Sequence, residues 1–220
     1  MFIEMKLWEL KALVNKGEGQ TIEFKRKATF PEKITKEIVA FANSNDGYLL
    51  IGVDDNGDIP GLKHLLEEKY VLDNAIRDHI KPVIKIKSSI VPINEKRSVL
   101  VYRIFESRRK PVFYIPDKSE KGIVFIRIED KSVQASREMI EIFRGQRRKK
   151  GINIHYGEKE TILMRYIERH KRVTVNQFRE AANISRREAS NTLVRLVLSN
   201  ILQISAGEKT DWYQANDPYN

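Results

Sequence analysis

The sequence of 220 residues contains no cysteine, which excludes disulfides, thiolate nucleophiles and cysteine-ligated zinc. Its four histidines are scattered, without the paired spacing of a metal site. No apolar run approaches the roughly 20 residues of a membrane-spanning helix, and no charged-then-apolar leader opens the chain. A phosphate loop with Gly-Lys-Ser/Thr is also missing, which argues against an ATPase. We therefore expect a soluble, cytoplasmic protein without a membrane partner.

Half of the net positive charge is concentrated in one short segment. The chain has a net charge of +10, and five of these charges lie in residues 144–150, RGQRRKK. Such an excess indicates a polyanionic partner. We expect Arg147, Arg148, Lys149 and Lys150 to hold the phosphate backbone of a nucleic acid. A solubilising run is the plainer interpretation of the same residues.

The pattern of apolar residues predicts two domains joined by this basic segment. Glycines at 145, 151 and 157 bracket a stretch without helical periodicity, so we expect a domain at 1–145, a linker at 146–157 and a second domain at 158–220. In the first domain the patterns predict an α+β fold, a mixed β-sheet with packed helices. Thr29 is the expected N-cap of its first confident helix. The expected strands are 21–25, 48–53, 83–91, 97–105, 111–116 and 122–129, and the expected helices 29–45, 64–80 and 136–144.

The second domain has the element order of a winged helix-turn-helix. Residues 158–171, 174–183 and 184–200 each predict a helix, and residues 201–215 predict a β-hairpin. Three helices followed by a hairpin are typical of the winged-helix form, whose third helix enters the major groove of DNA.

The third helix of this domain presents residues suited to reading DNA. Ser185 is the expected N-cap of this helix. Arg187, Asn191 and Arg195 recur every four residues on the side away from its apolar stripe. Arginine matches the edge of guanine and asparagine that of adenine, each with two hydrogen bonds. Arg186 and Arg172 are the expected phosphate contacts. The same face also fits a solvated helix or a protein-docking surface, and the groove-docking geometry favours DNA.

The continuous apolar run of residues 48–53, YLLIGV, predicts a strand covered on both faces, and an acidic turn follows it. Asp54 and Asp55 precede an Asn-Gly pair, and turn chemistry alone explains these residue types. Glu18 and Glu23 precede them in the chain, and if the two strands are neighbours these carboxylates meet at one end of the sheet together with Lys25. Carboxylates in such a cluster bind Mg²⁺ or Mn²⁺, whose bound water can attack a phosphate. The pattern leaves open a plain turn or a cation site.

Several segments resemble a known family. EGQTIEFK, KEIVAFANSNDGYLLIGVDDNGDIPGL, KPVFYI and GIVFIRIEDKSVQAS, within residues 14–143, resemble the Schlafen AlbA-type domain, also described as a divergent AAA-type domain. The resemblance implies DNA binding. Prokaryotic members often carry a C-terminal winged helix and are described as transcriptional regulators. The chain departs from the family at Asp46-Gly47, where Gly-Gly is usual, and at Glu129-Asp130, where a glycine is usual.

The eukaryotic relatives add two further implications. Some are RNA endonucleases that use two glutamates and an aspartate, which by motif fall on Glu18, Glu23 and one of Asp54 or Asp55, beside Lys25. Those proteins pair two such lobes, so a single lobe implies a homodimer.

From these patterns we predict a DNA-binding transcriptional regulator that acts as a homodimer, with DNA favoured over RNA as its partner. The alternatives are a metal-dependent endonuclease acting on RNA or DNA, in which Mg²⁺ or Mn²⁺ is the cofactor, and a regulatory module that docks protein. Salt-dependent affinity for nucleic acid separates the first prediction from the third, and Mn²⁺-dependent strand breaks identify the second.

Overall fold

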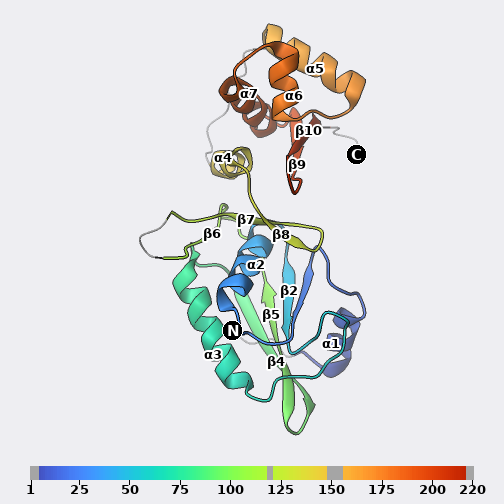
Figure 1. Ribbon diagram of the computed structural model, residues 1–220, viewed down its shortest axis with the longest axis vertical. Helices are drawn as coiled ribbons and strands as arrows, with labels where there is room; N and C mark the ends of the chain where they lie inside the picture. Colours follow the sequence, from blue (N-terminus) through green and yellow to red (C-terminus); the bar gives the residue numbers. More distant parts are fainter. Residues whose placement is uncertain (1–4, 118–120, 148–155, 217–220) are drawn as a thin grey trace. The chain divides into compact units, whose positions relative to one another are not determined.

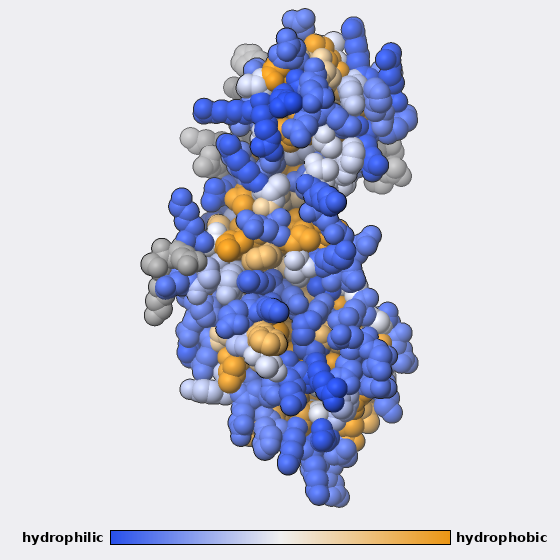
Figure 2. Space-filling model, in the orientation of Figure 1, coloured by the Kyte–Doolittle hydropathy of each residue, from blue (hydrophilic) through white to orange (hydrophobic). Residues whose placement is uncertain are grey.

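The computed structural model describes residues 5–117, 121–147 and 156–216 (Figure 1). The chain divides into two compact units, Met1–Gln134 and Ala135–Asn220. Hydrophilic side chains cover most of the visible surface, broken by small apolar areas (Figure 2). Across the described ranges, every helix is too short or too polar to cross a membrane.

The first unit is built on a four-stranded mixed sheet with the order β1-β2-β5-β4. β1 and β2 are parallel, and β5 pairs antiparallel with both β2 and β4. A helix, α2, forms the crossover that two parallel neighbours require. The predicted α+β class with a mixed sheet is therefore confirmed. These elements are β1 (Ile22–Lys25), α2 (Pro31–Asn43), β2 (Gly47–Ile51), β4 (Ile86–Asn94) and β5 (Arg97–Ile104).

The continuous apolar run of the central strand is buried on both faces, as its pattern predicts. Leu49 and Ile51 join the core that α2 and α3 (Leu65–His79) form on one face of the sheet. Leu50 joins a second core with α1 (Leu7–Val14) on the opposite face. Alternation of side chains along a strand sends neighbours to opposite faces, so each face needs its own helical cover.

Shorter elements complete the first unit. β3 (Ile80–Lys81) pairs with β6 (Phe113–Tyr114), and β7 (Phe125–Ile128) pairs with β8 (Lys131–Gln134). The last strand was not predicted. It follows Glu129, which has a φ of 54° at the turn of the hairpin. Left-handed backbone favours glycine, which gives a physical reason for the glycine usual near this position.

The helix α2 starts later than predicted. It begins at Pro31, with Phe30 in the cap position and no side-chain cap, so the prediction of Thr29 as N-cap was wrong. Proline suits the first helical position because its fixed φ is already helical and its missing N–H has no partner there anyway.

The second unit contains four helices and a hairpin among its described residues. Leu163, Phe178, Leu193 and Tyr213 are fully buried in its core. The three later helices and the hairpin follow the predicted order. The elements are α4 (Arg137–Gln146), α5 (Glu158–His170), α6 (Val175–Ala182), α7 (Arg186–Leu198), β9 (Leu202–Ser205) and β10 (Trp212–Ala215).

The helix α4 packs beside α7. The hydroxyl of Ser190 donates to the buried Glu138 carboxylate over 2.6 Å. A Cβ added to Gly145 would lie 2.3 Å from Cδ1 of Leu198, so the two helices approach closely there. Gly145 lies seven residues after Glu138 in α4, and Leu198 lies eight residues after Ser190 in α7. The two contacts follow each other in the same order along both helices, so the helices run parallel. The sequence placed this helix at the end of the first domain, whereas its contacts in the structure group it with the second unit.

Candidate nucleic-acid interface

The first two turns of α7 carry an exposed polar face. The Ser185 hydroxyl accepts a hydrogen bond from the backbone N–H of Glu188 over 3.1 Å and caps the helix, as predicted. Arg186, Arg187 and Asn191 are all exposed. The opposite side of the helix is buried in the core of the second unit, so these three side chains have no packing role there.

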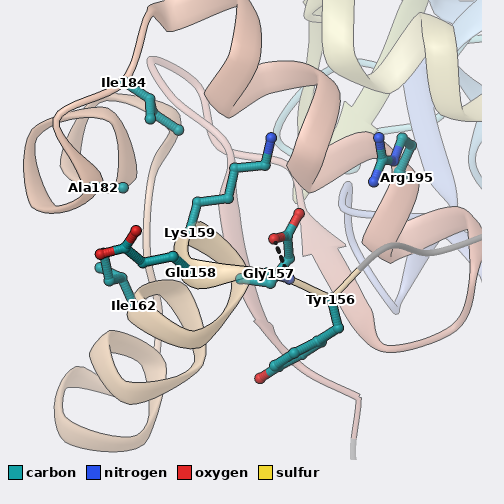
Figure 3. Close-up of a pocket in the computed structure, with 9 residues that line it drawn as sticks. Tyr156, Gly157, Glu158, Lys159, Ile162, Ala182, Ile184 and Arg195 are labelled. Carbon is teal, nitrogen blue, oxygen red and sulfur yellow. Dashed lines mark hydrogen bonds between the residues drawn. The ribbon is translucent and has the colours of Figure 1, made fainter.

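Arg195 lies in a different environment from Arg187 and Asn191. Its side chain is half-buried, and its Nε atom is buried with no hydrogen-bond partner among the described residues. It lines a cavity of about 520 Å³ beside the first turn of α5, together with Tyr156 and Lys159 (Figure 3). The sequence placed Arg195 on the outward face, and the structure places it in this recess.

Neighbouring helices pack on both sides of the exposed face of α7 and reduce its accessible surface. On one flank α4 packs against α7 and contacts Ser190, which is 3% exposed. On the other flank Lys159 of α5 pairs with Glu188 at 2.7 Å. Between the flanks a cavity of about 280 Å³ is lined by Lys159, Ser185, Arg187, Glu188, Asn191, Thr192 and Arg195.

The position of α4 decides which part of α7 is free to meet a large ligand. Glu138, the second residue of α4, is level with Ser190, so the first turn of α7 extends beyond α4. A helix with its side chains is about 10–12 Å across and the major groove of B-DNA about 12 Å wide, so two parallel helices cannot enter it together. Only the N-terminal half of α7 is free to enter such a groove.

Two further predicted phosphate contacts lie in the second unit. The Arg172 guanidinium lies 4.2 Å from the ring centroid of Trp212, on the hairpin. Arg172 is itself exposed, so the ring positions the cation without covering it. Arg147 is exposed at the C-cap of α4. The predicted contacts Arg148, Lys149 and Lys150 lie outside the described residues.

Two of the predicted acidic residues of the first unit, Glu18 and Glu23, lie in a mixed-charge network. Glu23 is buried and pairs with Arg127 Nη2 at 2.6 Å and with Lys25 Nζ. Lys25 Nζ also lies 3.4 Å from a carboxylate oxygen of Glu37. The Glu18 carboxylate accepts a hydrogen bond from the backbone N–H of Phe24 over 2.8 Å.

Burial and repulsion between carboxylates raise the pKa values of two residues in this network, Glu18 and Glu37. Burial raises the pKa of Glu18, and the charges of Glu23 and Asp55 add to this rise. Burial, together with repulsion from Glu23, raises the pKa of Glu37 to about 7, although Lys25 opposes the shift. Glu18, Glu23 and Asp55 are close enough to interact, as the sequence indicated, and the structure adds Glu37 to them.

The network is arranged for internal pairing. Two cations, Lys25 and Arg127, occupy the positions next to Glu23. Asp54 lies outside this arrangement, with an oxygen 3.5 Å from Arg26 Nε. Within the described parts of the chain, no three acidic or histidine side chains are grouped so that they would hold a metal ion.

The acidic turn itself has ordinary turn geometry. The backbone N–H of Gly57 donates to the carbonyl of Asp54 over 2.8 Å, and Gly57 has a φ of 86°. The side-chain oxygen of Asn56 accepts from the backbone N–H of Asp58 over 3.0 Å. The Asp, Asn and Gly residues therefore form the tight bend that their turn chemistry predicts.

Comparison with known proteins assigns the first unit. The family model described as Schlafen, AlbA_2 matches residues 18–136, more than half of the chain. The chain belongs to the Schlafen AlbA_2 family. The match ends close to the boundary between the two units. No curated protein matches the chain.

Two solved structures are distantly similar. One is the solution structure of the N-terminal domain of a Nitrosomonas europaea protein described as related to the ATP-dependent DNA helicase RecG, with 20% identity and a TM-score of 0.41 over 67% of this chain and 97% of that chain. The other is the crystal structure of the DIP2311 protein of Corynebacterium diphtheriae, with 14% identity and a TM-score of 0.44. That match covers 90% of this chain and 34% of that chain, so the chain spans about a third of its length.

Arg127 and Glu37 also belong to the charged network around Glu23, and no pattern in the sequence indicates that they do. The Arg127 side chain is 1% exposed, donates to the Gly19 carbonyl over 2.9 and 3.1 Å, and lies 5.0 Å from the Phe41 ring centroid. The available signal was an arginine within the apolar strand sequence FIRI. A charged residue in such a strand needs a buried partner, which sequence spacing does not identify.

The first departure from the family pattern also has a structural role. One carboxylate oxygen of Asp46 accepts from the backbone N–H of Glu106 over 2.8 Å. The following Gly47 is in close contact with the helix packed on the sheet, because an added Cβ would lie 2.3 Å from the Phe41 ring. A glycine is therefore needed at 47, and the acid at 46 ties two loops together.

Proposed function

We propose that the protein binds duplex DNA through the N-terminal half of α7 and regulates transcription. The observation that carries the proposal is the exposure of Arg186, Arg187 and Asn191 on the third helix of a helix-helix-helix-hairpin arrangement. That order is the one in which a winged-helix domain presents its recognition helix to the major groove. Membership of the Schlafen AlbA_2 family and the net charge of +10 support a nucleic acid as the partner.

Each side chain has a distinct task in this proposal. Arg187 and Asn191 contact base edges, because both chemically match purines and both project from the exposed part of α7. Arg186, Arg172 and Arg147 contact phosphates and set the orientation of the second unit. The proposal adds Arg148, Lys149 and Lys150 as further phosphate contacts. Arg195, half-buried in its recess, reads at most the edge of the site.

A homodimer completes the proposal. One copy presents a short stretch of α7, enough for only a few base contacts, and two copies on symmetric half-sites would double the specific contacts. Light scattering of the free protein and of its complex with a selected duplex tests this step. A single copy on every selected duplex would contradict it.

The proposal is tested by the affinity of the full chain for a duplex selected from a random library. We expect Arg187→Ala and Asn191→Ala each to weaken specific binding by about 1–3 kcal/mol and to relax the preference for one base pair. Arg186→Ala is expected to weaken binding to all duplexes similarly and to reduce the salt slope by about 0.9.

The matched control removes charge from the same unit away from α7. Arg165 and Arg169 are exposed on α5, and their alanine variants change the net charge as the α7 variants do. Their affinity for the selected duplex is expected to stay within about twofold of wild type, because a distant surface charge acts weakly at physiological salt. Equal losses in both sets, or no loss in the α7 set, would overturn the proposal.

A further inference from the structure

One end of the first unit's sheet carries aromatic and basic side chains on a single face. Tyr48, Arg103 and Lys87 are directly opposite one another on β2, β5 and β4. The next pair is Phe105 and Lys85, joined by a hydrogen bond from the Phe105 N–H to the Lys85 carbonyl over 3.1 Å. Opposite residues, and residues two apart on a strand, share a face, so all five side chains lie together. We call these five residues the sheet platform.

The rest of that face is covered by α1, which leaves the platform at its edge. The row that follows along the strands contains Leu50, Val101 and Ser89, whose two apolar members are buried in the core with α1. The alternate residues Ile86 and Ile104 point to the opposite face, into the core with α2 and α3. Tyr48 packs against the border of the core with α1, and the other four platform residues lie on the part of the sheet surface that neither helical layer fills.

Three cations of the platform converge on one aromatic ring. Lys85 Nζ lies 4.5 Å, Arg103 Cζ 4.7 Å and Lys87 Nζ 5.9 Å from the centroid of Phe105. Arg103 also lies 5.7 Å from the Tyr48 ring. Lysine and arginine held this close repel one another, and the negative face of a ring offsets this repulsion only in part.

Nearby carboxylates leave this charge incompletely balanced. Asp46 lies 3.7 Å from Arg103, with both side chains well exposed, so this pair is weak. Glu106 pairs instead with Lys110 at 2.7 Å. The Nε atom of Arg103 is buried and has no hydrogen-bond partner among the described residues. The platform therefore carries a surplus of positive charge.

We propose that the sheet platform binds single-stranded nucleic acid. Its cations match the phosphates, and Tyr48 and Phe105 match unpaired bases, which stack on aromatic rings. A cation–π contact at an exposed site is weaker than the stacking of a base, so an incoming base displaces a lysine from the Phe105 ring. The released lysine then pairs with the adjacent phosphate. A duplex cannot use these rings, because its bases are already stacked and paired.

Protection of the edge strand β4 is an alternative explanation of the platform, and it accounts for fewer of the platform residues than nucleic-acid binding does. β4 lies at an edge of the sheet, and lysines on edge strands prevent pairing with other chains. That role accounts for Lys85 and Lys87. It does not account for Arg103 and Phe105 on the interior strand β5 and its extension, or for Tyr48 on β2. The platform shares no residue with α7, so it goes beyond the proposed duplex site and is testable separately.

The test measures binding of the full chain to a fluorescent 20-residue oligothymidylate by anisotropy at several salt concentrations. Lys85→Ala combined with Lys87→Ala is expected to weaken binding at least tenfold and to reduce the salt slope by about 1.4, or 0.7 for each phosphate contact. Phe105→Leu is expected to weaken binding by about tenfold without changing that slope, because it removes stacking and keeps charge.

Two sets of controls separate this proposal from general charge effects and from the α7 site. Lys63→Ala combined with Lys96→Ala removes the same charge, and Lys96 lies at the turn of the β4–β5 hairpin, the opposite end of these strands. Arg187→Ala combined with Asn191→Ala alters only the second unit. Both double variants are expected to bind oligothymidylate within about twofold of wild type, as expected for distant charges. Circular dichroism checks that each variant is folded.

Three results would overturn the proposal. The first is wild-type protein that does not bind the oligothymidylate. The second is a loss for Lys63→Ala with Lys96→Ala as large as that for the platform lysines, which would indicate general charge attraction. The third is a folded Phe105→Leu variant with unchanged affinity for the oligothymidylate. That result would show that the platform contacts phosphates and that no base stacks on Phe105. Failure of the α7 proposal changes none of these outcomes.

Discussion

The pairing of Glu23 with Arg127 makes a strong prediction about the stability of the first unit. Glu23→Gln removes the only carboxylate that contacts the Arg127 guanidinium among the described residues. The arginine side chain is 1% exposed and the glutamate side chain 9% exposed, so water cannot replace the lost charge. Lys25 is affected less, because it keeps Glu37 at 3.4 Å.

The expected loss of unfolding free energy depends on the hydrogen bonds that Arg127 keeps after the substitution. Breaking a buried ion pair by removing one partner costs about 3–5 kcal/mol. The guanidinium still donates to the Gly19 carbonyl and to the Ser132 hydroxyl, and glutamine can still accept one hydrogen bond. We therefore expect the free energy of unfolding to fall by about 3 kcal/mol, near the lower end of that range.

Urea unfolding of the full chain measures this loss. Trp8 lies in the first unit and Trp212 in the second, so in a Trp8→Phe background the fluorescence reports the second unit alone, while circular dichroism reports both. Only the transition of the first unit is expected to move. Glu95→Gln, at the exposed turn of the β4–β5 hairpin, is the control and is expected to leave both transitions in place.

A double substitution checks the physical reasoning. Arg127→Met removes the buried charge, so Glu23→Gln combined with Arg127→Met is expected to lose much less than the sum of the two single losses. A loss below about 1 kcal/mol for Glu23→Gln, or strict additivity, would refute the claim that this is a desolvated ion pair. The endonuclease alternative makes a different prediction: Mn²⁺-dependent strand breaks that a folded Glu23→Gln variant lacks.

Three more predictions concern titration and packing. Because burial raises the pKa of Glu37 from 4.5 to about 7, the folded protein holds a proton that the unfolded chain releases, so stability falls between these pH values by on the order of 3 kcal/mol. Urea titrations of wild type and Glu37→Gln at pH 5 and 8 measure this, and parallel pH profiles would contradict it. Gly47→Ala is expected to cost about 1–3 kcal/mol, measured by thermal unfolding, because the new Cβ meets the buried Phe41 ring; an unchanged midpoint would show that the ring can move. Ser190→Ala leaves the buried Glu138 without its hydroxyl donor and is expected to lower the stability of the second unit by about 1–3 kcal/mol, seen as an earlier Trp212 transition; Thr161→Ala on the half-buried part of α5 serves for comparison.

Local patterns predicted the elements that depend on nearby residues. The apolar run of β2 indicated cover on both faces, which Leu49 and Leu50 have on opposite sides of the sheet. Ser185 caps α7 as its position indicated. The convergence of Glu18 and Glu23 near Asp55 was also predictable, because it requires only that β1 and β2 be neighbours.

Contacts between distant residues were beyond the reach of those patterns. Arg127 is 104 residues from Glu23, and no local periodicity indicates that a cation fills the position next to the glutamate. The position of α4 depends on Ser190, 52 residues from Glu138, and on the close approach of Gly145 to Leu198. Both contacts change the functional interpretation. The first balances the acidic cluster internally, and the second leaves only the start of α7 accessible.

Amide hydrogen exchange of the full chain shows directly whether the N-terminal half of α7 contacts DNA. Exchange is measured with and without a saturating selected duplex at physiological salt. We expect new protection in residues 185–191 and at Arg172, with little change along the outer face of α5. Protection confined to the first unit, or unchanged exchange in 185–191 while the duplex is bound, would show that α7 is not the DNA-binding element.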